Sequence, residues 1–259
     1  MGIVNVTPDS FFDGGWHVDA EAAYAHASRL LDEGADILDI GGESTRPGAA
    51  AVDAEQEIQR VVPLIERISK RNIPLSVDTR KPAVMRAALA AGAAMVNDVN
   101  ALRAPGALAA VADSGAAACL MHMQGQPETM QREPHYQDVV AEVFAYLNER
   151  VAACRAAGIA DERLVVDPGF GFGKTLEHNL ALLRALNRFN DLGVAVLAGL
   201  SRKASLGKLT GRPVGERIHA SVAAALAAVA RGAAIVRVHD VSATVDALKV
   251  WTAIGGTGP

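Results

Sequence analysis

Cysteine is scarce in this sequence, which has two, Cys119 and Cys154, in 259 residues. They lie far apart and form neither a C-x-x-C pair nor a disulfide framework, so we expect both to be reduced packing residues in a cytoplasmic protein. Histidine is also sparse. None of the seven histidines belongs to a ligand-spaced cluster such as H-E-x-x-H, which argues against zinc catalysis.

Neither sign of charge dominates, and long hydrophobic runs are missing. The 29 acidic residues against 25 Lys and Arg give a net charge of −4, which disfavours a nucleic-acid or anionic-membrane surface but permits a local cationic pocket. The apolar stretch VAAALAAVA (222–230) is shorter than the roughly 18 residues that a bilayer requires. The sequence therefore predicts a soluble protein.

No targeting signal is recognisable at the start of the sequence. The opening MGIVNVTPDS has neither the basic region nor the cleavable apolar segment of a secretory signal. Val6 stands where the myristoylation pattern needs Ser or Thr. We expect no membrane partner.

The stretch VVDPGFGFGKT (165–175) imitates two nucleotide-binding motifs and satisfies neither. It ends in the Gly-Lys-Thr of a P-loop, but Pro168 occupies the place of the opening glycine. The dinucleotide fingerprint fails because Lys174 and Leu176 stand where its last glycine would be. What this stretch does therefore depends on the fold that carries it.

Short apolar runs alternate with helix-period stretches along the whole chain. The predicted strands cover 2–6, 36–41, 74–79, 94–99, 117–122, 163–168, 194–200 and 234–239. Their apolar runs are continuous, as expected of strands covered on both faces. Eight strand–helix units favour a (β/α)8 TIM barrel in a single domain over residues 1–259. A doubly wound sheet is the alternative, but it rarely needs eight such units.

Helix ends are readable at several positions. We expect Asp19 to cap the first helix, Asp53 to cap the second and Ser242 to cap the last. Pro82 and Pro105 stand where the first turn of a helix tolerates proline.

In a barrel the catalytic groups lie at the carboxyl ends of the strands. Asp78, Asn97 and Asp167 come at three such ends, and buried acceptors of this kind suit a flat heterocycle with ring N–H and amino donors. Polar residues at the strand ends comprise Asn5, Asp39, Asp78, Asn97, His122, Asp167, Ser201, Arg202, Lys203, Arg237 and His239.

A second set at the same end is cationic. Arg46, Lys203, Arg237 and His239 follow strands 2, 7 and 8, a region where barrels often hold phosphate. We therefore predict a ligand with an aminopyrimidine-like end and a phosphate end, bound where the acidic and cationic sets meet in one cup.

The glycine-rich stretch after Asp167 is interpreted as a turn that holds the ring. Pro168 keeps Asp167 extended, and three glycines let the backbone pass close to a planar ligand. We expect Phe170 and Phe172 to form its walls. The polar loops 7–16 and 41–50 are candidate mobile lids.

Eight motifs together resemble those of the bacterial dihydropteroate synthase family, from Gly2 to about Trp251. They occur in family order and spacing, as NVTPDSF, GGESTRPG, VDTRKP, NDV, MHMQG, DPGFGFGK, SRK and RVHD. The resemblance implies a (β/α)8 enzyme of folate synthesis. It joins (7,8-dihydropterin-6-yl)methyl diphosphate to 4-aminobenzoate with release of pyrophosphate, and it is a sulfonamide target. The family also implies Mg2+ and a homodimer.

The resemblance implies a role for each matching residue. Pterin-binding positions are Asp78, Asn97, Asp167, Gly171 and Lys203; aminobenzoate positions are Phe11, Thr45, Arg46, Pro47, Phe172 and Ser201; diphosphate positions are Asn5, Arg46, Arg237 and His239. Asn5 is also the position associated with Mg2+. Catalytic positions are Asp13, Arg46, Lys203, Arg237 and His239.

Two rival readings remain open at this point. A methyltransferase that passes a methyl group from a folate to a corrinoid shares the barrel and a similar pterin pocket, but it needs no diphosphate set. A degenerate paralogue that only binds pterin or a partner is the non-enzymatic alternative, although here every expected polar position is filled.

Overall fold

The computed structural model describes residues 1–6, 15–43, 52–126 and 129–256. All eight predicted strands are present, each shorter than its apolar run. The strands are β1 (Gly2–Asn5), β2 (Leu38–Gly41), β3 (Leu75–Asp78), β4 (Met95–Asp98), β5 (Ala117–Met121), β6 (Leu164–Asp167), β7 (Ala195–Ala198) and β8 (Ile235–Val236).

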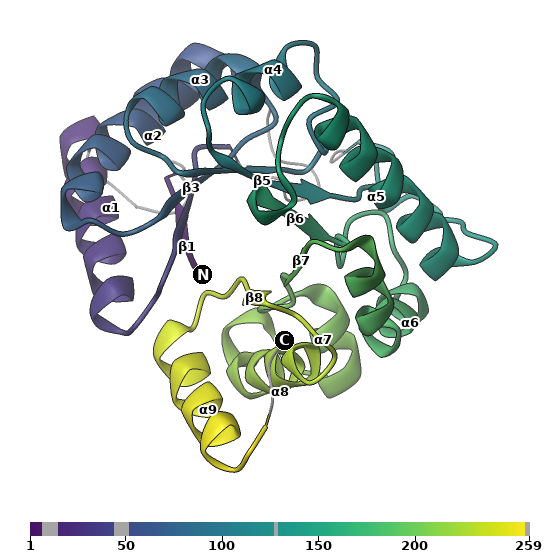
Figure 1. The fold of residues 1–259 in the computed structure, drawn as a ribbon. Coiled ribbons are helices and arrows are strands. Elements are labelled where there is room, and N and C mark those ends of the chain that lie inside the picture. The colour runs from purple at the N-terminus through teal and green to yellow at the C-terminus, as the bar shows by residue number, and fades with distance from the viewer. Residues whose placement is uncertain (7–14, 44–51, 127–128, 257–259) are drawn as a thin grey trace.

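The strands form one parallel sheet in consecutive order from β1 to β8, and the sheet is curled (Figure 1). Its two ends are linked by hydrogen bonds next to β8. Ile3 donates its amide to the carbonyl of Val238 at 3.1 Å, and Val238 donates to the carbonyl of Met1 at 3.0 Å. An isolated parallel bridge pairs Gly2 with Val238. The strand count and order agree with the sequence prediction.

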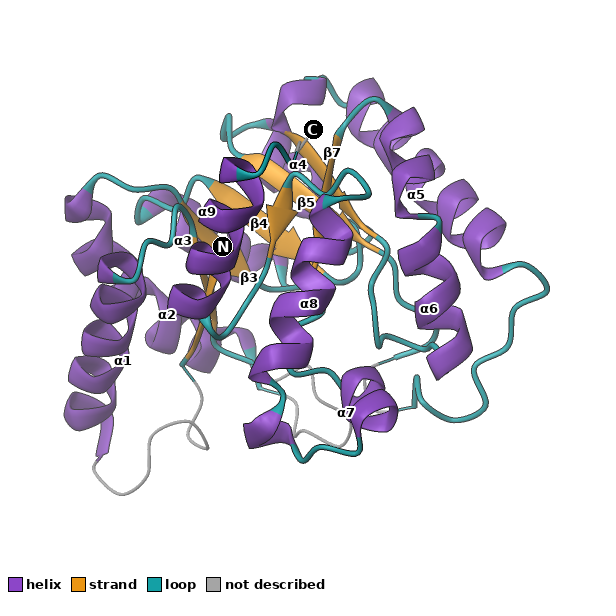
Figure 2. Cartoon of the chain, turned by 90° about the horizontal axis from the view of Figure 1, so that it is seen from below, coloured by secondary structure: helices purple, strands orange, loops and turns teal. Residues whose placement is uncertain are grey.

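Helices lie outside the strands (Figures 1 and 2). They are α1 (Gly15–Asp32), α2 (Ala54–Ile68), α3 (Pro82–Ala90), α4 (Ala107–Ala112), α5 (Val139–Ala156), α6 (Leu176–Arg184), α7 (Ala204–Thr210), α8 (Ile218–Val229) and α9 (Val241–Ala253). Short 3-10 turns cover Ser69–Arg71, Asp161–Arg163, Leu186–Leu192 and Val214–Glu216. Over the described ranges, every helix is too short or too polar to cross a bilayer.

Two of the five predicted helix ends are confirmed. The Asp53 carboxylate accepts from the amide of Gln56 at 2.8 Å, and Pro82 is the first residue of α3. The other three are wrong. Helix α1 begins four residues before Asp19, α4 begins two residues after Pro105, and Ser242 is the second residue of α9.

Alternate residues of several strands enter two different hydrophobic cores. One set, including Val4, Ile40 and Val166, belongs to the large core that also contains buried side chains of the helices. The other set is smaller and comprises Met1, Met95, Cys119, Val165 and Leu197. Because side chains alternate across a strand, the second set marks the interior of the curl. The interior is therefore apolar toward the amino ends of the strands, which leaves the carboxyl ends for polar groups.

Candidate active site

At the carboxyl ends of the strands, Arg237 lies between the fully buried carboxylate of Asp39 and the partly buried carboxylate of Asp78. Arg237 donates from Nε to Oδ2 of Asp39 at 2.5 Å and from Nη2 to Oδ2 of Asp78 at 2.8 Å. Asn97 donates to the same Oδ2 of Asp39 at 3.0 Å. The strand register explains this meeting, because Asp78 pairs with Asn97 on one side and Gly41, two residues beyond Asp39, on the other. These side chains thus share one face.

Burial and neighbouring charges shift the pKa values of Asp78 and Arg237. Burial raises the pKa of Asp78 to about 7; Arg237 opposes the shift and Asp39 adds to it. Burial acts to lower the pKa of Arg237, but Asp39 and Asp78 outweigh it and hold that pKa above its ordinary value. Asp39 is fully buried, and its Oδ1 has no hydrogen-bond partner among the described residues. A buried acceptor of this kind is available to a ligand donor.

Asp167 and Lys203 form the second half of the site. Asp167, at the end of β6, accepts from the amide of Gly169 at 2.7 Å, and burial raises its pKa while Lys203 opposes the rise. Burial lowers the pKa of Lys203 to about 8, against the attraction of Asp167. Lys203 donates to the carbonyl of Phe170, and its Nζ lies 4.5 Å from the ring centroid of Phe172.

The two halves adjoin at Gly199, which follows β7. A methyl group on Gly199 would lie 3.8 Å from Oδ2 of Asp167 and 4.0 Å from Cβ of Arg237. The acids and the cations therefore occupy one cup, as the sequence predicted. Within it, Arg237 of the cationic set lies between Asp39 and Asp78, so the two sets are in direct contact.

The loops after β7 and β8 are joined by two contacts. Ser201 Oγ accepts from the amide of His239 at 3.1 Å and lies 3.0 Å from its Nδ1. Beside them, Arg202 and Asp240 form a two-pronged ion pair, with distances of 3.0 and 2.5 Å. Arg202 adopts a left-handed backbone conformation with φ of 56°. This pair ties the SRK motif to the RVHD motif.

Ten of the predicted site residues lie in the described part of the chain. Asn5 ends β1; Gly171 and Phe172 follow β6. A side chain at Gly171 would meet the aliphatic part of Lys203 at 3.2 Å. The predictions that fall outside the described residues are Phe11, Asp13, Thr45, Arg46 and Pro47.

The two phenylalanines of the glycine-rich stretch behave differently. Phe170 is fully buried and belongs to the large core, so the prediction that it forms a wall of the site is wrong. Phe172 is half-buried under Lys203.

The roles of Asp39 and of the Arg202–Asp240 pair were not predicted. Asp39 stood among the polar strand ends without a function. An aspartate two residues before the glycine that ends β2 is a signal that sequence reasoning could have used, since alternate residues share a face.

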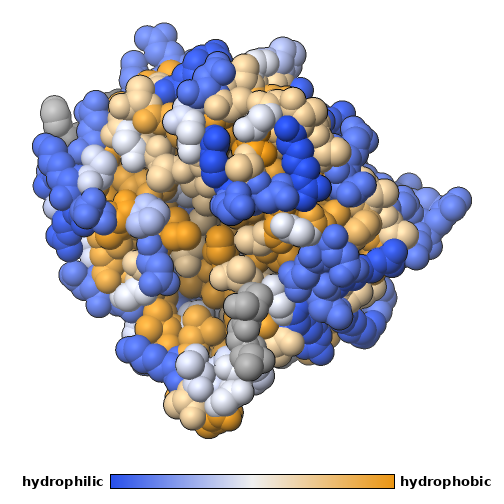
Figure 3. All heavy atoms as spheres, in the orientation of Figure 1, coloured by the Kyte–Doolittle hydropathy of each residue, from blue (hydrophilic) through white to orange (hydrophobic). Residues whose placement is uncertain are grey.

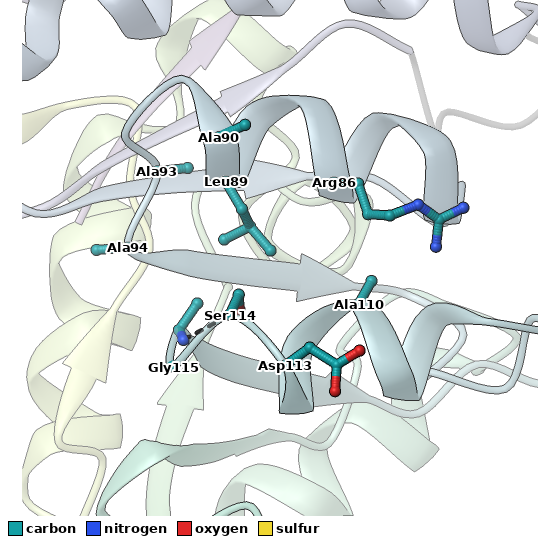
Figure 4. A pocket seen from close by; sticks show the side chains of 10 residues that line it. Arg86, Leu89, Ala90, Ala93, Ala94, Ala110, Asp113, Ser114 and Gly115 are labelled. Atoms are coloured by element: carbon teal, nitrogen blue, oxygen red, sulfur yellow. Dashed lines mark hydrogen bonds between the residues drawn. The ribbon is translucent and has the colours of Figure 1, made fainter.

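Two hollows lie away from this site. One, of about 510 Å³, is lined by Leu89 of α3 and by several alanines, with Arg86 and Asp113 at its edge (Figure 4). The other, of about 400 Å³, is lined by Met1, Ile37 and their neighbours at the amino ends of the strands. Figure 3 shows hydrophobic residues over the middle of one face. Neither hollow contains the clustered acids and cations of the strand ends.

Comparisons of sequence and fold with known proteins point to a single family. The family described as "Pterin binding enzyme" matches residues 1–239. A dihydropteroate synthase of Neisseria meningitidis serogroup B is 57% identical over 98% of this chain and 92% of its own. The Xanthomonas albilineans dihydropteroate synthase structure with 4-aminobenzoic acid is 61% identical, covers 99% of this chain and 93% of its own, and superposes with a TM-score of 0.93. A second structure from that organism, in complex with 7,8-dihydropteroate, is 58% identical with a TM-score of 0.91. By sequence, by fold and by the polar groups at its strand ends, this chain belongs to the dihydropteroate synthase family of pterin-binding enzymes.

Proposed function

We propose that this chain is a dihydropteroate synthase, which joins (7,8-dihydropterin-6-yl)methyl diphosphate to 4-aminobenzoate and releases pyrophosphate. The observation that carries the proposal is the shared cup, in which Arg237 bonds Asp39 and Asp78 while Lys203 lies beside Asp167. The related structures with 4-aminobenzoic acid and with 7,8-dihydropteroate supply the substrate class. Near-full-length similarity to relatives of that name leaves the methyltransferase and the degenerate paralogue without support.

The pterin end of the substrate suits the buried acceptors. Asp78 and Asp167 accept from the ring N–H and amino groups of the pterin, and Asn97, held by its bond to Asp39, supplies an amide at the same edge. Charge-assisted hydrogen bonds of this kind are about twice as strong as neutral ones. Lys203, whose Nζ lies 4.5 Å from the ring centroid of Phe172, contacts the pterin ring on the side of Phe172. Buried carboxylates thus select an aminopyrimidine by pairing with its donors.

The reacting end needs a cationic environment. The C–O bond to the diphosphate breaks, the nitrogen of 4-aminobenzoate forms the new bond to that carbon, and the amine loses a proton. Negative charge grows on the departing oxygens, where Arg237 and His239 stabilise it. We propose that bond breaking precedes amine attack, and no covalent enzyme intermediate is needed. Arg46, Asp13, Thr45, Pro47 and Phe11 complete the predicted set.

Asn5 is the position predicted for magnesium, and its side-chain amide oxygen suits that ion. It ends β1 in register with Gly41, which pairs in turn with Asp78, so an amide oxygen stands at the rim. Mg2+ takes oxygen ligands and is commonly held by one or two protein groups together with substrate phosphates. A bound Mg2+ would neutralise charge on the departing diphosphate.

We also propose the finer architecture and the assembly. The Gly2–Val238 bridge supports a closed (β/α)8 barrel in one domain, and the family supports a cytoplasmic homodimer. Leu209 and Val214, 53% and 58% exposed, are large apolar side chains that a partner subunit would cover. Val214→Asp should then convert a dimer into a monomer in light scattering after gel filtration. Val250→Asp, at a similarly exposed position on α9, is the matched control. A dimer that survives Val214→Asp would exclude that surface.

The direct test of the activity is to supply the pterin diphosphate, 4-aminobenzoate and Mg2+ and to follow pyrophosphate release. The proposal predicts release that needs both substrates for turnover, and formation of 7,8-dihydropteroate in equal amount. A sulfonamide should compete with 4-aminobenzoate. Pterin binding without turnover under these conditions would instead support the degenerate paralogue.

A further inference from the structure

The lysine that ends the DPGFGFGK motif is buried next to the site. Lys174 is 3% exposed. Its Nζ lies 2.9 Å from Nδ1 of His122 and donates to the carbonyls of Gly169 and Phe172, each at 3.0 Å. Its resemblance to a P-loop lysine is misleading, because a P-loop lysine binds phosphate whereas this ammonium binds its own loop.

The carbonyls of the loop are all engaged by side chains. From residue 169 to residue 173 each carbonyl accepts a hydrogen bond, and the donors are Lys174, Lys203, Gln131, Lys174 and Tyr136 in that order. Two of the five bonds come from Lys174. They hold the carbonyls on either side of Gly171, the residue that lies against Lys203.

The geometry of Lys174 is that of an ammonium. An ammonium has three N–H donors, and three close acceptors surround this one: two carbonyls and Nδ1 of His122. For Nδ1 of His122 to accept from Lys174, the imidazole must be neutral and carry its proton on Nε2. Burial, with Lys174 adding to it, lowers the pKa of His122 to about 3, so the ring stays neutral at ordinary pH. Burial lowers the pKa of Lys174 to about 7, while Asp167 opposes that shift.

Close packing brings the backbone of this loop against residues 122–124. A methyl group on Gly169 would lie 1.8 Å from the carbonyl oxygen of His122, and one on Gly173 would lie 2.6 Å from that of Gln124. The backbone of the loop therefore presses directly on residues 122–124. Lys174 enters the same contact and neutralises the carbonyl dipoles that converge there.

We propose that Lys174 is a positioning residue of the pterin site, whose buried ammonium fixes the carbonyls of Gly169 and Phe172 and lies close enough to Asp167 to support its negative charge. The inference rests on the proposed function, because it assigns Lys174 to the binding of the pterin. It does not touch the ligand; it acts through Asp167 and through the loop that carries Gly171 and Phe172.

The test compares three variants with the wild-type chain: Lys174→Met, which removes the charge, Lys174→Arg, which keeps it, and Lys208→Met, the control at an exposed lysine on α7. Affinity for 6-hydroxymethylpterin is measured by titration calorimetry. Charged hydrogen bonds of this kind predict weakening by about 10- to 100-fold for Lys174→Met. Partial recovery is expected for Lys174→Arg, with no change for Lys208→Met. Loss of packing alone would not be rescued by the bulkier arginine.

Amide hydrogen exchange provides a second measurement. Lys174→Met should speed exchange at Gly169, Gly171 and Phe172 while β6 keeps its protection. If Lys174→Met does not fold, Lys174→Arg and Lys174→Gln are compared instead, and weaker pterin binding by the neutral glutamine than by arginine supports the role. Equal affinity in the wild type and a folded neutral variant would overturn the inference. A wild-type chain that binds no pterin would overturn the proposed function instead.

Discussion

Replacing Asp78 by asparagine should stabilise the protein while it damages the site. In the folded chain burial raises the pKa of Asp78 to about 7, whereas an unfolded aspartate has a pKa of about 3.9. Between these values the folded state holds a proton that the unfolded state has lost. The contribution of Asp78 to stability is therefore greatest at low pH and falls as the pH rises to about 7, above which it stays constant.

The size of the effect follows from this difference of about 3 pH units. Each unit corresponds to roughly 1.4 kcal/mol, so the buried carboxylate costs up to about 4 kcal/mol above pH 7. Asparagine has no such charge, and its carbonyl oxygen can still accept from Arg237, which keeps its bond to Asp39. Asp78→Asn should therefore raise the free energy of unfolding, and its advantage should grow by about 2–3 kcal/mol between about pH 5 and about pH 8.

Urea unfolding of both chains at the two pH values measures this quantity. Asp113→Asn, at an exposed carboxylate at the end of α4, is the control and should change stability by less than about 0.5 kcal/mol. Pterin affinity should fall in Asp78→Asn because a charged acceptor has been lost. A stability difference that does not vary with pH, or a variant less stable than the wild type at about pH 8, would refute the reasoning.

Further predictions concern Arg237 and the glycine-rich loop. Arg237→Met leaves Asp39 and Asp78 without their cation and should lower the free energy of unfolding by about 3–5 kcal/mol at neutral pH; a loss below about 1 kcal/mol in urea unfolding would contradict the ion-pair account. Gly169→Ala should lower it by about 3 kcal/mol or more, because the new methyl group meets the carbonyl of His122. The control Gly115→Ala has a similar φ of 76° but no atom within 4 Å, so it should lose only about 1–2 kcal/mol. Equal losses for the two alanines would show that contact with His122 is unimportant.

The strands and the cup were predictable because both depend on local patterns. Each predicted apolar run contains a strand, and β3 and β6 end at the polar residues Asp78 and Asp167. Parallel strands bring their carboxyl ends to one edge, so the neighbours of Asp78 followed from strand order. The prediction that acidic and cationic side chains meet at the carboxyl ends of the strands did not depend on the structure of the loops.

Helix starts and loop side chains were not predictable in the same way. Asp19 is an acceptable cap, but the helix already runs through it from Gly15, and nothing local excludes the earlier start. Phe170 lies in the core between two glycines with left-handed φ, Gly169 and Gly171, and no local pattern fixes that direction. The placement of Lys174 depends on residues 122–124, about 50 positions away, and no spacing rule connects them.

The pairing of charges across the cup also lay beyond the sequence. A row of acids and a row of bases predicts attraction, but whether Arg237 faces the carboxylates or the solvent depends on the curl of the sheet. The structure places it between Asp39 and Asp78, so the two acids share one counter-ion.

The measurement that tests the central claim most directly is the affinity of 6-hydroxymethylpterin for the wild type and for Asp167→Asn, both checked for folding. If Asp167 accepts hydrogen bonds from the pterin ring, Asp167→Asn should bind the pterin at least about tenfold more weakly, since a charged hydrogen bond is worth roughly 1.5–3 kcal/mol. Unchanged affinity would mean that the pterin does not pair with this end of β6, and the proposed site would be wrong.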